Sequence, residues 1–139
     1  MSDTTLKSKF LMLQEALRKL SIIHKKSKKE FLEDFLISDT AIRNLQVSIE
    51  SISDIGNYLL KRNSDTIPQT RVEIFQLLCR HGYLPNEMED VLIEMARFRN
   101  LIVHRYDSIK LEMVYSILQE QLSFLKEVAV IMSDKIGGI

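Results

Sequence analysis

The sequence of 139 residues has no tryptophan, one cysteine, two prolines and four glycines. The single cysteine, Cys79, excludes a disulfide within this sequence and a zinc site built from several cysteines, and it suits a reducing compartment. We therefore expect a cytoplasmic protein. Because proline and glycine are the residues that most disfavour a helix interior, their scarcity leaves long segments free to be helical.

Long hydrophobic runs and an excess of one charge are also missing. No apolar run approaches the ~20 residues that cross a bilayer, and Lys7 and Lys9 make the start too polar for a signal peptide, so we expect neither export by that route nor a membrane span. Nineteen basic residues balance 19 acidic ones. This balance disfavours a domain that binds nucleic acid through its overall charge, and any RNA site must be a local patch.

The apolar residues that are present recur in alternating steps of three and four, the period of a helix with one buried face. This pattern predicts long helices over residues 6–20, 42–59 and 111–132, shorter ones over 31–36 and 70–81, and a further helix that opens near Asn86. We expect a turn near Ser38 and Asp39, one of which would cap the helix that follows, and a capping box at Thr70 and Glu73. The prediction is one domain, residues 1–139, an all-α up-and-down bundle of about five helices.

The helix after Asn86 carries the residues with the most chemistry. On an ideal helix Arg99 and His104 lie about 140° apart, so they would flank a groove rather than stack. A guanidinium holds phosphate through two directed bonds and stabilises charge in a transition state. An imidazole can take a proton from a ribose 2′-hydroxyl or give one to a leaving 5′-oxygen. Arg99 and His104 are therefore candidate catalytic residues for metal-independent RNA cleavage.

Other polar residues surround these two on the same helix. Arg97, Asn100 and His104 share one face, and Arg99, Val103 and Tyr106 share the next if the helix extends that far. Carboxylates are sparse near this stretch, so a two-metal nuclease is not supported and we expect no metal or other cofactor. Arginine and histidine at this spacing also occur by chance, and a solvated or interface-facing helix end explains the residues alone equally well.

The string Met95-Ala96-Arg97-Phe98-Arg99-Asn100-Leu101-Ile102-Val103-His104-Arg105-Tyr106 resembles the R-x4-H-x-Y signature of HepT toxins within the HEPN superfamily. The turn at residues 82–85 and the order of helices extend the resemblance over nearly the full length. It implies a HEPN-type bundle and a homodimer. It also implies that Arg99 and His104 of two protomers form a metal-independent ribonuclease site in a cleft at the dimer interface.

The same resemblance implies how the toxin is controlled. Tyr106 matches the tyrosine to which an MNT-domain nucleotidyltransferase antitoxin attaches AMP, which silences the toxin. Asn100 matches the common Arg-Asn step and would support the site, whereas Arg97 has no clear counterpart. The implied function is an endoribonuclease or tRNA nuclease of a type VII-like HEPN/MNT toxin–antitoxin system.

Two alternatives stay open at this point. One is a catalytically silent nucleotide-binding or adaptor bundle that supports a nucleotidyltransferase partner. The other is a dimeric scaffold whose exposed apolar residues, such as Phe98 or Val103, bury an interface. We interpret Cys79 and His81 as structural or incidental, and the basic run from His24 to Lys29 as a solvated face.

Overall fold

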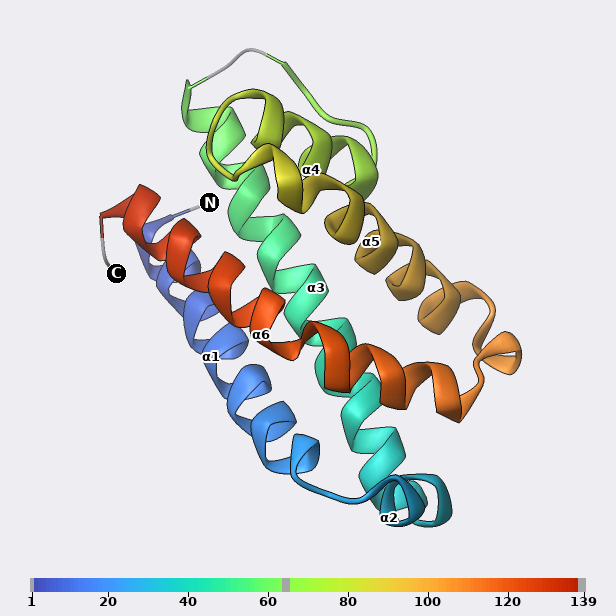
Figure 1. Cartoon of the computed structure of the whole chain (residues 1–139). Coiled ribbons are helices and arrows are strands. Elements are labelled where there is room, and N and C mark those ends of the chain that lie inside the picture. Colours follow the sequence, from blue (N-terminus) through green and yellow to red (C-terminus); the bar gives the residue numbers. More distant parts are fainter. Residues whose placement is uncertain (1, 64–65, 138–139) are drawn as a thin grey trace.

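The computed structural model describes residues 2–63 and 66–137, which form six α-helices, two 3-10 turns and no strand (Figure 1). This confirms the all-α bundle predicted from the sequence, with six α-helices in this part of the chain where about five were expected. The α-helices are α1 (Asp3–His24), α2 (Lys28–Glu33), α3 (Phe35–Asn63), α4 (Arg71–Arg80), α5 (Glu89–His104) and α6 (Leu111–Ile136), and the 3-10 turns are η1 (Asn86–Met88) and η2 (Tyr106–Ser108).

The central element is α3, which runs through the bundle and contacts all five other α-helices. Its apolar stripe, including Leu45, Ile49 and Ile52, is buried against them. Burying one such side chain contributes about 1.5–3 kcal/mol, so this stripe fixes how α3 is rotated about its own axis. The rotation also decides which polar residues of α3 face α5 and α4.

The start of α3 differs from the prediction. Asp34 begins the helix, because its carboxylate Oδ1 accepts the N–H of Leu36 at 2.9 Å and its backbone oxygen accepts that of Ser38 at 3.1 Å. The predicted turn and cap at Ser38 and Asp39 are therefore wrong. Thr40 remains compatible with a helix because its hydroxyl donates to the carbonyl of Leu36. As a result, α3 carries Asp39 one turn inside its start.

The segment before the motif helix contains the predicted turns, with two differences in capping. Thr70 Oγ1 accepts the N–H of Glu73 at 3.1 Å, but the carboxylate of Glu73 accepts the N–H of Gln69, so only half of the capping box forms. Gly82, with a φ of 78°, follows α4 in the left-handed conformation that glycine tolerates. Asn86 does not cap α5, since no side-chain hydrogen bond caps that helix or η1.

No helix within residues 2–63 and 66–137 is both long enough and apolar enough to cross a membrane.

Candidate functional site

The motif helix α5 is held in place by its apolar side. Phe98 and Ile102 are 3% and 6% exposed, and their burial leaves Arg99 between them facing α3. Phe98 therefore cannot bury an intermolecular interface, which corrects one reading of the sequence. Val103, on the outer side, is 41% exposed.

Arg99 is fixed by a carboxylate of the central helix. Its Nε and Nη2 both donate to Oε2 of Glu50 at 2.8 Å, and Nη1 donates to Oδ1 of Asn100 at 3.3 Å. Gln46, one turn before Glu50 on α3, donates to the same Oε2 at 3.3 Å. The side chains of Arg99 and Glu50 are 19% and 27% exposed, so the pair lies at the edge of the core. The guanidinium is thus oriented, and the Arg99 side chain is not fully buried.

The charges around this pair favour the ionised form of Glu50. Burial alone would raise the pKa of Glu50, but hydrogen bonds from Arg99 and Gln46 and the positive charges of Arg99 and Arg71 outweigh it, so the pKa lies below its usual value. Arg71, on α4, has a lowered pKa, first because it is partly buried and next because Arg99 is near. Two arginines, Arg99 and Arg71, therefore interact electrostatically with the carboxylate of Glu50.

His104 is the last residue of α5 and is exposed. Within the described residues it forms no hydrogen bond or ion pair, so both ring nitrogens are open to a ligand. His104 lies five positions after Arg99, which is ~7.5 Å along the helix axis. The two predicted catalytic residues therefore share one helix, with Arg99 fixed against α3 and His104 projecting at the helix end.

The predicted supporting residues lie in two different places. Asn100 contacts Arg99 and lines a polar hollow of about 430 Å³ that also includes Arg71. Arg97 is exposed and lines a separate hollow of about 320 Å³ between α5 and α6, together with Phe98 and Leu101. The structure brings Asn100 to the site of Arg99 and places Arg97 elsewhere.

Tyr106 does not continue the motif helix. The helix ends at His104, Arg105 adopts φ −139° and ψ 47°, and Tyr106 opens the 3-10 turn η2. The shared face of Arg99, Val103 and Tyr106 was expected only if the helix extended to Tyr106, and it does not. Instead, the Tyr106 hydroxyl lies 3.5 Å from Oδ1 of Asp39, as a long hydrogen bond that ties η2 to α3.

The side chain of Tyr106 is accessible, with 53% of its surface exposed. Its pKa is raised, first because the hydroxyl is partly desolvated and then because of the charge and hydrogen bond of Asp39. The hydroxyl therefore stays protonated at neutral pH, next to a carboxylate that can accept its proton.

Sequence reasoning missed Glu50 and Asp39, which lie 49 and 67 residues from their partners along the chain. No local pattern marks them, because the contacts exist only where α3 passes the motif. They add carboxylates near the motif that the sequence did not indicate. Even so, no group of three His, Cys, Asp or Glu in the described part of the chain could hold a metal ion.

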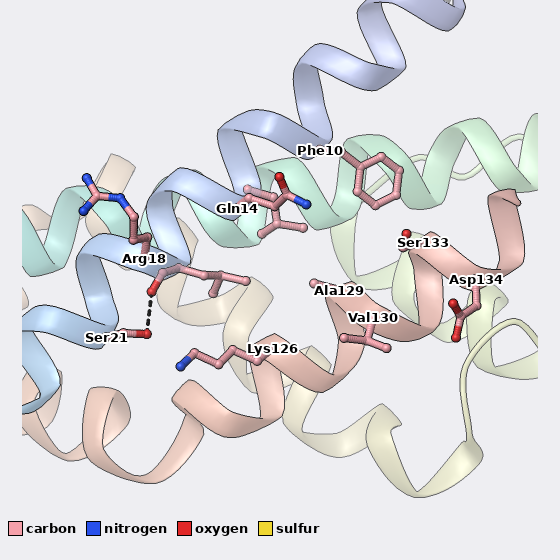
Figure 2. Close-up of a pocket in the computed structure, with 11 residues that line it drawn as sticks. Phe10, Gln14, Arg18, Ser21, Lys126, Ala129, Val130, Ser133 and Asp134 are labelled. Atoms are coloured by element: carbon pink, nitrogen blue, oxygen red, sulfur yellow. Dashed lines mark hydrogen bonds between the residues drawn. The ribbon is translucent and has the colours of Figure 1, made fainter. Parts of the chain in front are cut away.

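Two other places lack the chemistry of the motif. Cys79 is buried, its thiol donates to the backbone oxygen of Pro85 at 3.6 Å, and burial raises its pKa to about 11, so it is not a nucleophile at neutral pH. A hollow of about 480 Å³ between α1 and α6 is lined by apolar and polar side chains and by no motif residue. Figure 2 shows Phe10 of α1 opposite Ala129 and Val130 of α6 in this hollow.

Comparison with known proteins gives a family for this chain. The family described as "Ribonuclease HepT-like" matches residues 13–132. Among curated proteins, the "mRNA nuclease HepT" of Shewanella oneidensis is 32% identical over 93 residues, which cover 67% of this chain and 70% of that protein.

Solved structures agree with this assignment. The tri-AMPylated Shewanella oneidensis HEPN toxin, solved in complex with an MNT antitoxin, has a TM-score of 0.85 and 25% identity, and the match covers 96% of this chain and 99% of that one. A toxin–antitoxin structure with AMP-PNP has a TM-score of 0.82 at 24% identity, with 95% and 99% covered. The second likeness supports the fold alone.

The Arg99–Glu50 pair predicts an acid-sensitive contribution to stability. Because the pKa of Glu50 is lowered in the fold, the pair stabilises fully above the unfolded value of about 4.3 and loses its contribution as pH falls through the folded value. Glu50→Gln should lower the free energy of unfolding by about 1 kcal/mol at pH 7. The difference from wild type should vanish at low pH in urea titrations.

Glu127→Gln is the matched control, since it removes an exposed carboxylate of α6 that forms no ion pair within the described residues. A Glu50→Gln effect equal to that of Glu127→Gln at every pH would contradict the assigned role of the pair.

Proposed function

Because the chain belongs to the HepT-like ribonuclease family of HEPN/MNT toxin–antitoxin systems, we propose that it is a ribonuclease toxin in which Arg99 and His104 cleave RNA without a metal ion. The observation that carries the proposal is the state of these two side chains. Arg99 is held by Glu50 with its side chain not fully buried, and His104 is exposed with no partner in the described residues. A fixed cation and an open imidazole are what phosphodiester transfer requires.

The reaction uses the RNA itself as the nucleophile. An imidazole takes the proton of the 2′-hydroxyl, the 2′-oxygen attacks the neighbouring phosphorus, and the bond to the 5′-oxygen breaks. The leaving 5′-oxygen receives a proton, so the products are a 2′,3′-cyclic phosphate and a 5′-hydroxyl. Arg99 offsets the negative charge that develops on the phosphoryl oxygens. No water or metal ion enters this balance.

One imidazole cannot be base and acid in the same step, and a homodimer supplies the second one. Exposed apolar side chains at the motif end support such a dimer: Phe35 and Leu36 at the start of α3 are 70% and 66% exposed, and Val103 lies beside His104. The Tyr106–Asp39 contact brings η2 to this end of α3. A two-fold interface here would place a second His104 across the cleft.

Control by AMP transfer fits the position of Tyr106. The hydroxyl oxygen would attack the α-phosphorus of ATP, pyrophosphate would leave, and the phenolic proton would be released. The reaction puts one negative charge and a nucleotide at the exposed end of η2, beside His104 and Asp39. An RNA backbone would then be repelled from the cleft. The partner would be an MNT-domain nucleotidyltransferase antitoxin, as in the Shewanella oneidensis complex.

The substrate within this proposal is RNA, cut internally. The curated relative is called an mRNA nuclease, and a tRNA remains the narrower alternative. The protein would act in the cytoplasm as one domain over residues 1–139. The competing function is a catalytically silent nucleotide-binding or adaptor bundle that only supports its nucleotidyltransferase, and the accessibility of Tyr106 is compatible with both functions.

His104→Ala should abolish cleavage of total RNA in EDTA and relieve growth arrest on induced expression. Loss of general acid–base catalysis predicts a fall in rate of roughly 10²–10⁴-fold. His81→Ala removes the exposed histidine after α4 and should leave the rate unchanged. If wild type is harmless and inert, or His104→Ala cuts RNA as fast as wild type, the nuclease proposal fails and the adaptor remains.

Tyr106→Phe should prevent the nucleotidyltransferase from incorporating AMP from labelled ATP. The variant should therefore still cleave RNA after treatment with the nucleotidyltransferase and ATP. The reason is that the phenol oxygen is the only atom removed. Tyr58→Phe, which loses a half-buried hydroxyl of α3, is the control and should be modified like wild type. Intact-mass measurement of both proteins after the reaction decides, and equal AMP incorporation would contradict the assignment of Tyr106.

A further inference from the structure

Arg71 is an arginine of the site that the motif does not include. It is the first residue of α4, and that helix packs closely on α3: a Cβ added at Gly56 would lie 2.5 Å from Leu78 Cδ1. This close approach packs α4 against α3, and the hydrogen bond from Arg71 to Ser53 holds the start of α4 on the stretch of α3 that carries Glu50. Arg71 and Arg99 consequently sense each other's charge, although one belongs to α4 and the other to α5.

The Arg71 side chain is anchored by one atom only. Its Nε donates to the Ser53 hydroxyl at 2.7 Å, and Ser53 is itself fixed because its hydroxyl donates to the backbone oxygen of Glu50 at 2.9 Å. Neither Nη nitrogen of Arg71 has a hydrogen bond or a carboxylate within ion-pair distance in the described residues. Four of the five N–H donors of the Arg71 guanidinium therefore have no protein acceptor in the described residues.

The nearby carboxylates are already engaged. Oε2 of Glu50 accepts two donors from Arg99, and Asp54 pairs with Lys9 at 3.0 Å. A half-buried arginine with no carboxylate of its own leaves a local excess of positive charge in a chain whose net charge is zero. Such a site favours an anion, and a guanidinium fits two phosphate oxygens at once.

The space in front of Arg71 leads to the motif. A polar hollow of about 430 Å³ is lined by Ser53, Asn57, Gln69, Thr70, Arg71 and Asn100, among others. Asn100 is hydrogen-bonded to Arg99, the residue proposed to bind the phosphate that is cleaved. The hollow therefore extends from the neighbour of Arg99 toward α4. Its amide and hydroxyl groups can bond to ribose and phosphate oxygens.

We propose that Arg71 is a second phosphate-binding residue, which holds the RNA backbone next to the phosphate that Arg99 engages. The chemical class of ligand is the phosphodiester of single-stranded RNA, and Arg71 positions the strand without taking part in proton transfer. This inference rests on the proposed function for the identity of the ligand.

The experiment measures binding apart from cleavage. A fluorescein-labelled single-stranded RNA is titrated with the His104→Ala protein, by anisotropy, at several salt concentrations. Adding Arg71→Gln should weaken binding about 5–10-fold and lower the slope of log K against log salt by about 0.7, the value for one phosphate contact on a single strand. Arg71→Lys should keep that slope because it keeps the charge.

Arg80→Gln is the matched control, because it removes the same charge from an exposed position at the other end of α4. The inference is overturned if Arg71→Gln and Arg80→Gln change affinity and slope equally, or if Arg71→Gln lowers affinity but keeps the slope of the His104→Ala parent. It is also overturned if the His104→Ala protein binds no RNA. If Arg71→Gln fails to fold, Arg71→Lys is compared with Arg71→Ala instead. The inference then predicts that Arg71→Lys binds RNA more tightly and with a steeper salt dependence than Arg71→Ala.

The outcome is independent of whether the protein is a nuclease. RNA binding that depends on Arg71, in a wild-type protein that cuts no RNA, would sustain this inference and refute the proposed function. Cleavage by wild type with no role for Arg71 in binding would support the proposed function and refute this inference.

Discussion

The hydrogen-bonded ion pair between Arg99 and Glu50 sets where the positive charge of the motif lies. Arg99 belongs to α5 and Glu50 to α3, and two of the guanidinium nitrogens, Nε and Nη2, meet one carboxylate oxygen. A long flexible side chain would otherwise sample many rotamers, and in the proposed reaction fixing Arg99 before substrate arrives would remove an entropic cost. The rest of the site depends on this contact because Asn100 is oriented by Arg99 in turn.

The central helix does more than bury apolar surface. One polar side of α3 supplies Asp39 to Tyr106, Glu50 to Arg99 and Ser53 to Arg71. The same helix thereby coordinates η2, α5 and α4. Its length matters, because a helix that started at residue 39, as the sequence suggested, would not hold Asp39 inside a regular turn. Asp34 provides the earlier start that places Asp39 inside the helix, whereas Glu50 and Ser53 already lie in the segment that the sequence predicts as helical.

The sequence predicted most of the fold and the identity of the motif, because helix period and a local string are local properties. It failed where a contact joins distant segments or where polar residues interrupt a stripe. Ser38 and Asp39 resemble a cap by composition, yet Ser38 is 1% exposed within the helix. The sequence allowed Phe98 to lie at an interface, but the packing of α5 buries it in the core. Glu50 carries no sequence mark, since only the packing of α3 against α5 makes it a partner of Arg99.

The central claim is that fixed Arg99 and open His104 perform a transfer that uses the ribose 2′-oxygen. The most direct measurement identifies the ends of the RNA products made by the purified protein in EDTA, by mass spectrometry, with a matched oligonucleotide that lacks the 2′-hydroxyl at the cleavage position. The account predicts a 2′,3′-cyclic phosphate and a 5′-hydroxyl, with no cleavage at the substituted position. A 5′-phosphate end, cleavage of the 2′-deoxy position, or a requirement for added Mg²⁺ would contradict it.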